Sequence, residues 1–398
     1  MDRLNNTVRP YAWGSVTAIP ELLGTDPTDE PQAELWMGAH PGAPSRLDRG
    51  AGPVPLDQVI DGDPEGELGP AAVARFGPRL PYLLKVLAAA APLSLQVHPD
   101  LAQARAGHRD EEERGVPADA PHRNYKDANH KPELICALTL FEGLCGFRPA
   151  AGAADLLDGL GVDGLKPYAD ALRAQPEEDA LREVFAGVLR ADREELAPTV
   201  EAAGRAAEKL GTTATPYAAD YAAYGALARS WPGDPGVIAA FLLNVVRLQP
   251  GEALFLGAGV PHAYLDGVGV EIMANSDNVL RCGLTPKHVD VPELLKIVSF
   301  TPGAPEVLRA GPDGRYAVPV DDFRLHRHDL DEGPVTVTAT ADGGAPQILL
   351  CTDGSAELTN AAGEHLALHR GESAFVPAAD GTLHATGSGT LFRATTAG

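Results

Sequence analysis

A helical block that interrupts β-rich sequence most constrains how this chain can fold. Residues 1 to about 149 are rich in Pro and Gly and contain only short apolar runs, which is typical of strands and turns. Between 150 and 241, Ala, Leu, Glu and Arg dominate, and four apolar residues recur at helical spacing: Leu181, Val184, Val188 and Leu189. Short apolar runs typical of strands return after residue 242. We therefore expect one discontinuous β-domain, residues 1–149 and 242–309, with a helical domain, residues 150–241, inserted into it.

The C-terminal part of the chain repeats a pattern from the first β-domain. The segment 248–255, with Gly251 and Glu252, matches the segment 368–375, with Gly371 and Glu372, and a histidine follows each copy. A turn glycine, a strand and an inward-facing histidine resemble the second motif of the cupins, which are double-sheet jelly rolls. The second copy has no Gln-x-His-Pro before it and no matching Glu. We therefore predict a second, metal-free jelly roll at 310–398, so that the fold is mainly β, with two cupin-like jelly rolls plus an α-helical domain.

The segment 92–100 is a candidate source of metal ligands. Its apolar and polar residues alternate as in a half-buried strand, so Ser94, Gln96 and His98 share one face, and Leu93, Leu95 and Val97 the other. Glu133 precedes an apolar run, and His262 follows the run 253–256. Together Gln96, His98, Glu133 and His262 make a mixed nitrogen and oxygen set that suits a zinc-like divalent metal.

Charge and composition exclude several classes of function. The chain has 55 acidic and 32 basic residues, a formal net charge of −23, which argues against nucleic acid and anionic membranes as partners. No run of eighteen apolar residues occurs, and the first residues lack the apolar core of a signal peptide. The four cysteines are Cys136, Cys145, Cys282 and Cys351. Their spacing fits neither a zinc ribbon nor a disulfide framework, so we expect reduced, buried thiols and a cytoplasmic location.

Six segments, in the same order along the chain, resemble the type I phosphomannose isomerases. They span roughly residues 10 to 300: Tyr11–Ser15, Glu34–Gly38, Leu93–Asp100, Asn124–Glu133, Gly257–Tyr264 and Val270–Lys287. The resemblance implies an isomerase that interconverts mannose 6-phosphate and fructose 6-phosphate through a cis-enediol, feeding mannose metabolism and GDP-mannose supply. It also implies one Zn²⁺ per chain, held by Gln96, His98, Glu133 and His262.

An aldose–ketose isomerisation needs a proton-transfer base and an electrophile for the developing oxyanion. Glu271 lies opposite the apolar face of Val268, Val270 and Ile272, so we expect it in the cavity. The sequence leaves the base open among four candidates: Glu271, Tyr264, His130 and Lys131. The resemblance implies a catalytic role for Arg281 in stabilising charge, and a structural salt bridge to Asp277 is the alternative.

An anionic substrate in an acidic protein also requires local cations. Lys85 interrupts an otherwise apolar strand, so it either reaches a polar cavity or disturbs a core. The candidate substrate-binding residues all lie in the matching segments: Trp13, Ser94, Lys85 and Lys287. For Trp13, packing alone is the alternative.

Two other functions fit the same ligand set. The alternatives are another metal cupin, such as an oxygenase, and a non-catalytic sugar-phosphate binder. We expect a solvated loop for the acidic run 110–113. We expect surface or structural roles for five histidines in the C-terminal part of the chain: His326, His328, His365, His369 and His384. The expected partner is a small sugar phosphate, with no nucleic acid and no membrane, and we expect a monomer.

Overall fold

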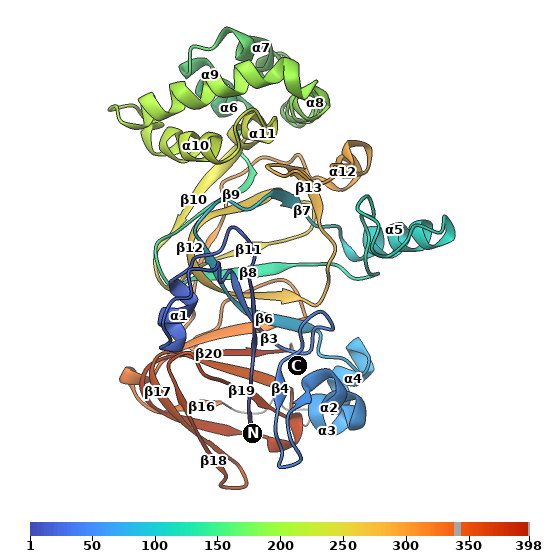
Figure 1. Ribbon diagram of the computed structural model, residues 1–398, viewed down its shortest axis with the longest axis vertical. Coiled ribbons are helices and arrows are strands. Elements are labelled where there is room, and N and C mark those ends of the chain that lie inside the picture. Colours follow the sequence, from blue (N-terminus) through green and yellow to red (C-terminus); the bar gives the residue numbers. More distant parts are fainter. Residues whose placement is uncertain (338–343, 397–398) are drawn as a thin grey trace.

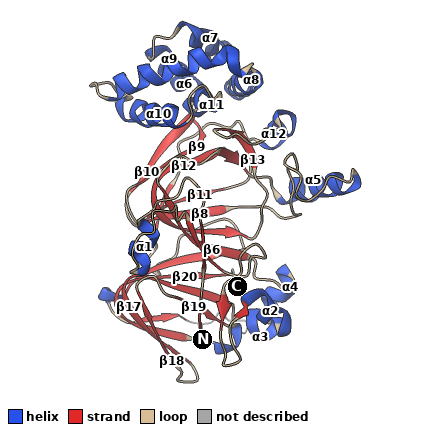
Figure 2. Cartoon of the chain, viewed as in Figure 1, coloured by secondary structure: helices blue, strands red, loops and turns tan. Residues whose placement is uncertain are grey.

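The computed structural model describes residues 1–337 and 344–396. Residues 338–343 and 397–398 of the expected C-terminal jelly roll lie outside the described part. Two β-rich regions follow one another along the long axis of the molecule, and a group of helices covers one end (Figures 1 and 2). The predicted β-rich fold with a helical region is confirmed.

The larger sheet is antiparallel and carries the first β-domain. Its main path runs through β14 (Val307–Arg309), β11 (Glu252–Leu256), β8 (Glu133–Ala137), β12 (His262–Ala274), β6 (Tyr82–Ala89), β3 (Glu34–Met37) and β2 (Thr7–Arg9). A second layer branches from β12 and comprises β9 (Phe141–Phe147), β10 (Leu243–Leu248), β7 (Leu95–Val97) and β13 (Leu280–Gly283). A separate short pair is β4 (Arg46–Leu47) with β5 (Val54–Pro55).

Strand β12 joins the two layers because it changes partners at Gly267. Up to Asp266 it pairs with β9 and β7, and from Gly267 it pairs with β6 and β8. Gly267 has φ +117°, and a Cβ there would lie 2.6 Å from the carbonyl oxygen of Leu140. A larger side chain would therefore clash at this bend. The bend lets one strand supply residues from both of its halves to the same interior.

The second sheet forms the C-terminal β-domain. Its path runs through β1 (Asp2–Arg3), β19 (Ser373–Val376), β17 (Gln347–Asn360), β20 (Leu383–Thr395) and β15 (Arg324–Asp329), with β18 (His365–His369) on β17 and β16 (Val335–Val337) on β20. Short 3₁₀ helices are η2 (Leu330–Glu332) and η3 (Ala378–Asp380). One shared apolar core joins the two β-domains, because Val86, Ile272 and Leu134 of the first pack in the same buried cluster as Phe323 and Phe392 of the second.

A block of helices lies between β9 and β10. Its helices are α6 (Ala150–Gly159), η1 (Asp163–Leu165), α7 (Lys166–Ala174), α8 (Glu177–Arg190), α9 (Arg193–Gly211), α10 (Ala218–Ser230) and α11 (Gly236–Phe241). Leu181, Val184 and Val188 are buried on one side of α8, as their spacing predicted. The exact limits of the three domains stay a prediction. No helix in the described ranges is both long and apolar enough to cross a bilayer.

The sequence analysis did not predict the helices in the first 149 residues or α12 further along the chain. They are α1 (Ala18–Leu23), α2 (Leu56–Gly62), α3 (Pro64–Leu68), α4 (Pro70–Phe76), α5 (Leu101–Glu113) and α12 (Val291–Ile297). The expectation of a loop at 110–113 was wrong, because these residues end α5. A capping box between Asp100 and Gln103 begins this helix. Glu111 is buried and accepts the backbone N–H groups of Asn124 and Tyr125, both at 2.9 Å.

The two copies of the internal repeat share a backbone turn, but their histidines differ in burial. Gly251 and Gly371 have φ +86° and +85°, so both copies begin with the same left-handed turn. His262 is fully buried, whereas His384 is exposed and its Nδ1 lies 3.1 Å from Thr336 Oγ1. The expectation of an inward-facing histidine is therefore wrong for the second copy. Cys136, Cys145, Cys282 and Cys351 are buried free thiols, as predicted.

Candidate metal centre and active site

Three buried side chains converge where β7, β8 and β12 meet. His98 follows β7, Glu133 begins β8 and His262 begins β12. Glu133 Oε2 lies 3.4 Å from Nε2 of His98 and 3.4 Å from Nε2 of His262. Among the described residues, these three form the one group of three or more His, Cys, Asp or Glu side chains with ligand atoms close enough to hold a metal.

Gln96 completes the set because of strand register. It lies directly opposite His262 in the antiparallel pairing of β7 and β12, and its side-chain Nε2 is 3.4 Å from His262 Nε2. Since amide oxygen and nitrogen are interchanged by a simple flip, the oxygen of Gln96 can occupy that place. Leu95 and Val97 are buried on the opposite face, as the alternation predicted, but Leu93 packs with a different cluster beside Trp13.

Hydrogen bonds outside the cluster decide which histidine nitrogens are protonated. His98 Nδ1 donates to the carbonyl of Asn278 at 2.8 Å, and His262 Nδ1 donates to the carbonyl of Val260 at 2.9 Å. A neutral imidazole has one N–H, so both Nε2 atoms point lone pairs at Glu133. Burial lowers the pKa of His98 to about 4, which keeps its ring neutral.

Two acceptor atoms at the centre of this cluster lack a donor. His98 Nε2 and Glu133 Oε2 are buried and have no hydrogen-bond partner in the described part of the chain. Unpaired buried acceptors facing one another are costly, and a cation among them removes that cost. Two imidazoles, a carboxylate and an amide oxygen therefore fit a divalent zinc-like ion.

A second buried cluster lies on the neighbouring strands. Lys85 Nζ is 2.9 Å from Glu271 Oε2 and 3.7 Å from Glu34 Oε1, while Tyr264 OH donates to Glu271 Oε1 at 2.9 Å. Trp36 Nε1 donates to Glu34 Oε2 at 2.6 Å. Lys85 and Glu271 are directly opposite on β6 and β12, so register alone brings them together. Glu271 is buried rather than exposed to solvent, and Lys85 enters a polar interior.

Burial and neighbouring charges shift the pKa values of the groups in this cluster. Burial raises the pKa of Glu271 above its ordinary value, and the nearby Glu133 and Glu34 raise it further, against the influence of Lys85. Burial alone would lower the pKa of Lys85, but Glu271, Glu34 and Glu133 raise it overall, so Lys85 stays charged. A carboxyl group with a raised pKa is better matched to proton transfer near neutral pH than an ordinary glutamate.

Three cations lie near one another beside Gln96. Arg281 on β13 lies directly opposite Gln96 on β7, so both side chains leave the sheet on the same face. Arg281 lowers the pKa of Lys287, and Lys126 lowers it further, as expected of neighbouring like charges. The sequence analysis missed Lys126, although Lys126 lies inside one of the matching segments.

The salt bridge from Arg281 to Asp277 is not formed. Asp277 Oδ1 is instead 3.4 Å from His40 Nε2, and its backbone N–H donates to Asp127 Oδ2 at 2.7 Å. Within residues 1–337 and 344–396, Arg281 has no ion pair with any acid, and burial lowers its pKa. The guanidinium is therefore available to an anionic ligand.

Asn278 is a second residue that sequence reasoning missed. It is fully buried, and its side chain accepts the N–H of Lys126 at 2.7 Å and donates to the carbonyls of Asp127 at 2.7 Å and Asn129 at 2.8 Å. Its own carbonyl holds His98. One asparagine thus connects the loop bearing Lys126 to a candidate metal ligand.

The remaining site candidates lie near these clusters with different degrees of contact. Lys131 Nζ is 3.0 Å from Glu133 Oε1, and His130 Nε2 is 3.0 Å from Asp322 Oδ2. Ser94 is half-buried two residues before Gln96. Trp13 is half-buried and stacks on Tyr11, with ring centroids 5.7 Å apart. Their roles stay predictions.

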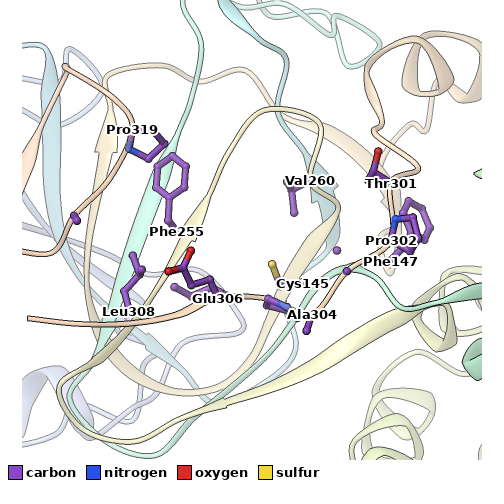
Figure 3. Close-up of a pocket in the computed structure, with 15 residues that line it drawn as sticks. Cys145, Phe147, Phe255, Val260, Thr301, Pro302, Ala304, Glu306, Leu308 and Pro319 are labelled. Atoms are coloured by element: carbon purple, nitrogen blue, oxygen red, sulfur yellow. The ribbon is translucent and has the colours of Figure 1, made fainter.

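Two other histidines and one cavity lie apart from this centre. His326 and His328 stack 5.8 Å apart, and burial lowers their pKa values to about 3 and 4. A cavity of about 330 Å³ opens beside Phe147, Phe255 and Pro319 (Figure 3). None of the four candidate ligands lines it, so it is not the metal site.

Comparisons with known proteins agree with this geometry. A family model for the catalytic domain of type I phosphomannose isomerase matches residues 1–150, and one for the cupin domain of mannose-6-phosphate isomerase matches residues 313–396. The chain is 42% identical over 400 residues to the mannose-6-phosphate isomerase of Escherichia coli K12, covering 99% of each. This chain belongs to the type I phosphomannose isomerase family. It is also 35% identical over 415 residues to mannose-6-phosphate isomerase 1 of Arabidopsis thaliana, covering 98% of this chain and 92% of that protein.

Solved structures of the family have the same fold. A zinc-bound mannose 6-phosphate isomerase superimposes with a TM-score of 0.89 at 39% identity, covering 100% of this chain and 99% of that one. A phosphomannose isomerase mutant from Salmonella typhimurium gives a TM-score of 0.90 at 39% identity, with the same coverage. The expected family and fold are therefore confirmed over the whole chain.

Proposed function

We propose that this chain is a zinc-dependent isomerase that interconverts mannose 6-phosphate and fructose 6-phosphate. The observation that carries the proposal is the buried set of three facing acceptors, His98, Glu133 and His262, in a member of a family with zinc-bound structures. Gln96 is the fourth proposed ligand. When bound, zinc supplies Lewis-acid polarisation of the sugar oxygens and stabilises negative charge on the enediol.

The proposed role of the cations is to hold the phosphate and the developing charge. The net charge of −23 repels a sugar phosphate, so binding requires a local group of positive charges. Arg281, Lys287 and Lys126 supply this group beside Gln96. Arg281 has a planar fork of donors suited to an oxyanion or phosphate, whereas each lysine acts as a point charge. Ser94 and Trp13 are proposed to position the sugar.

We assign the base to Glu271 among the four candidates. Its raised pKa lets it accept a proton from one sugar carbon and return it to the neighbouring carbon. Lys85 and Tyr264 each hold one of its oxygens, which fixes the carboxylate. Burial and Glu271 raise the pKa of Tyr264 well above its usual value, so its phenol remains a donor. His130 and Lys131 are then left for ring opening.

The cellular setting is proposed on composition and burial. Four buried free thiols and an acidic surface suit a protein of the reducing cytoplasm that does not bind nucleic acid. We propose that the enzyme acts as a monomer, and light scattering of the purified chain tests this.

The direct test is a coupled assay with mannose 6-phosphate as substrate. We expect fructose 6-phosphate to form, activity to disappear on exhaustive chelation, and activity to return on adding Zn²⁺, with one zinc per chain by elemental analysis. A zinc-replete protein that binds the sugar phosphate without turnover would support the non-catalytic binder instead. Iron together with oxygen uptake would support the oxygenase.

The reaction in heavy water tests the proton-transfer route. A carboxylate base such as Glu271 that takes a proton from carbon exchanges it partly with solvent, so we expect deuterium at C1 or C2 of the product, measured by mass spectrometry and NMR. A hydride shift carries the hydrogen directly between the carbons. Product free of deuterium at every extent of conversion would therefore contradict Glu271 as a solvent-exchanging base.

A further inference from the structure

One active-site candidate is held by the other β-domain. His130 precedes Lys131 and Glu133, whereas Asp322 lies just before β15 in the part of the chain matched by the separate cupin-domain model. Nε2 of His130 and Oδ2 of Asp322 are 3.0 Å apart, although 192 residues separate them. This is a direct polar contact between the loop that leads into β8 and the C-terminal β-domain.

The contact determines which ring nitrogen of His130 carries the hydrogen. Asp322 is only 8% exposed, and His130 is the one hydrogen-bond or ion-pair partner of its carboxylate among the described residues. A buried carboxylate requires a donor, so Nε2 of His130 carries a hydrogen and donates it. In the neutral ring, Nδ1 is then the acceptor. A carboxylate that binds one ring nitrogen in this way leaves the other available as a base.

The C-terminal packing holds Asp322 in place. The next residue, Phe323, is fully buried in the core shared by the two β-domains. The preceding residue, Asp321, forms ion pairs with Arg75 and Arg324 on the surface. Asp322 therefore has little freedom to follow the imidazole, and instead the imidazole is set by Asp322.

We propose that Asp322 is a positioning residue for the isomerase, which fixes the orientation and tautomer of His130 and so couples the C-terminal jelly roll to the reaction. This inference rests on the proposed function. It gives the C-terminal jelly roll a chemical contribution besides packing. The residue touches neither the proposed ligands nor the Lys85–Glu271 cluster, so its effect must pass through His130.

The kinetic test compares Asp322→Asn with Asp321→Asn. Asp322→Asn keeps the size of the side chain but removes the charge that selects the Nε2–H tautomer of His130. We therefore expect kcat to fall on the order of tenfold. KM, zinc content and melting temperature should stay near those of wild type. Asp321→Asn removes a neighbouring carboxylate that does not contact His130 and should leave kcat within about twofold of wild type.

A double-mutant cycle separates positioning from a general structural effect. If Asp322 acts through His130, adding Asp322→Asn to His130→Ala should change kcat by less than about twofold. Equal, multiplicative losses in both backgrounds would overturn the proposal. Should Asp322→Asn fold poorly, Asp322→Glu keeps the carboxylate on a longer arm, and retention of most of the wild-type kcat is then expected. A tenfold loss in a folded Asp322→Glu variant would count against the need for that carboxylate.

A spectroscopic test does not depend on turnover. Imidazole ¹⁵N chemical shifts distinguish Nε2–H from Nδ1–H, and comparison with His130→Ala identifies the His130 signal. We expect the Nε2–H tautomer in wild type and its partial loss in Asp322→Asn, but not in Asp321→Asn. An unchanged His130 signal in Asp322→Asn would overturn the inference, whereas absence of isomerase activity in zinc-loaded wild type would overturn only the proposed function.

Discussion

Replacing His98 or His262 with alanine is expected to remove the bound zinc and at least about a thousandfold of kcat/KM, because Lewis-acid stabilisation is worth several kcal/mol. Each histidine presents a lone pair to Glu133 across 3.4 Å, and its other nitrogen is tied to a backbone carbonyl. Within the described part of the chain, no further His, Cys, Asp or Glu side chain joins this group to replace either nitrogen. Elemental analysis and the coupled assay measure the two losses on the same preparation.

His384→Ala is the matched control for these variants. His384 is the histidine at the corresponding place in the C-terminal repeat, but it is exposed and bonded to Thr336. This variant should retain one zinc per chain and wild-type turnover. If His98→Ala kept stoichiometric zinc and activity, the proposed centre would be wrong. Thermal melting of all three variants shows whether any loss reflects unfolding.

Changing Arg281 to lysine is expected to cost about a hundredfold in kcat, on the order of 3 kcal/mol of transition-state stabilisation. The side chain forms no ion pair with an acid in the described ranges, so the substitution breaks no salt bridge. Lysine keeps the charge but loses the planar fork of donors. Zinc content and melting temperature should therefore stay near the wild-type values while turnover falls.

The kinetic constants of Arg281→Lys distinguish two roles. A loss confined to kcat indicates stabilisation of charge in the transition state, whereas a rise in KM alone indicates ordinary phosphate binding. Arg315→Lys, on the exposed surface of the C-terminal jelly roll, is the control for a loss of arginine as such. A rate within about threefold of wild type for Arg281→Lys would contradict the catalytic role.

Local patterns in the sequence were enough to predict most of the fold and the candidate ligands. Alternation in 92–100 correctly placed Gln96 and His98 opposite Leu95 and Val97, and the same rule placed Glu271 opposite Val270 and Ile272. Such predictions succeed because successive side chains in a strand point to opposite faces, so the face depends only on whether the position is odd or even. Helical spacing likewise located α8 and its buried face. The order of the matching segments supplied the family.

By itself, then, the sequence determined the alternation of β-rich and helical regions, the candidate metal ligands and the isomerase family, since each depends on neighbours along the chain or on short motifs. Only the tertiary structure decided which distant groups meet: Lys85 with Glu271, Asn278 with the His98 ring, and His130 with Asp322. It also showed that Arg281 does not pair with Asp277 and that His384 faces outward. Periodicity reports the face on which a residue lies, but a pairing across many residues depends on strand register, on the bend at Gly267 and on how the two β-domains pack.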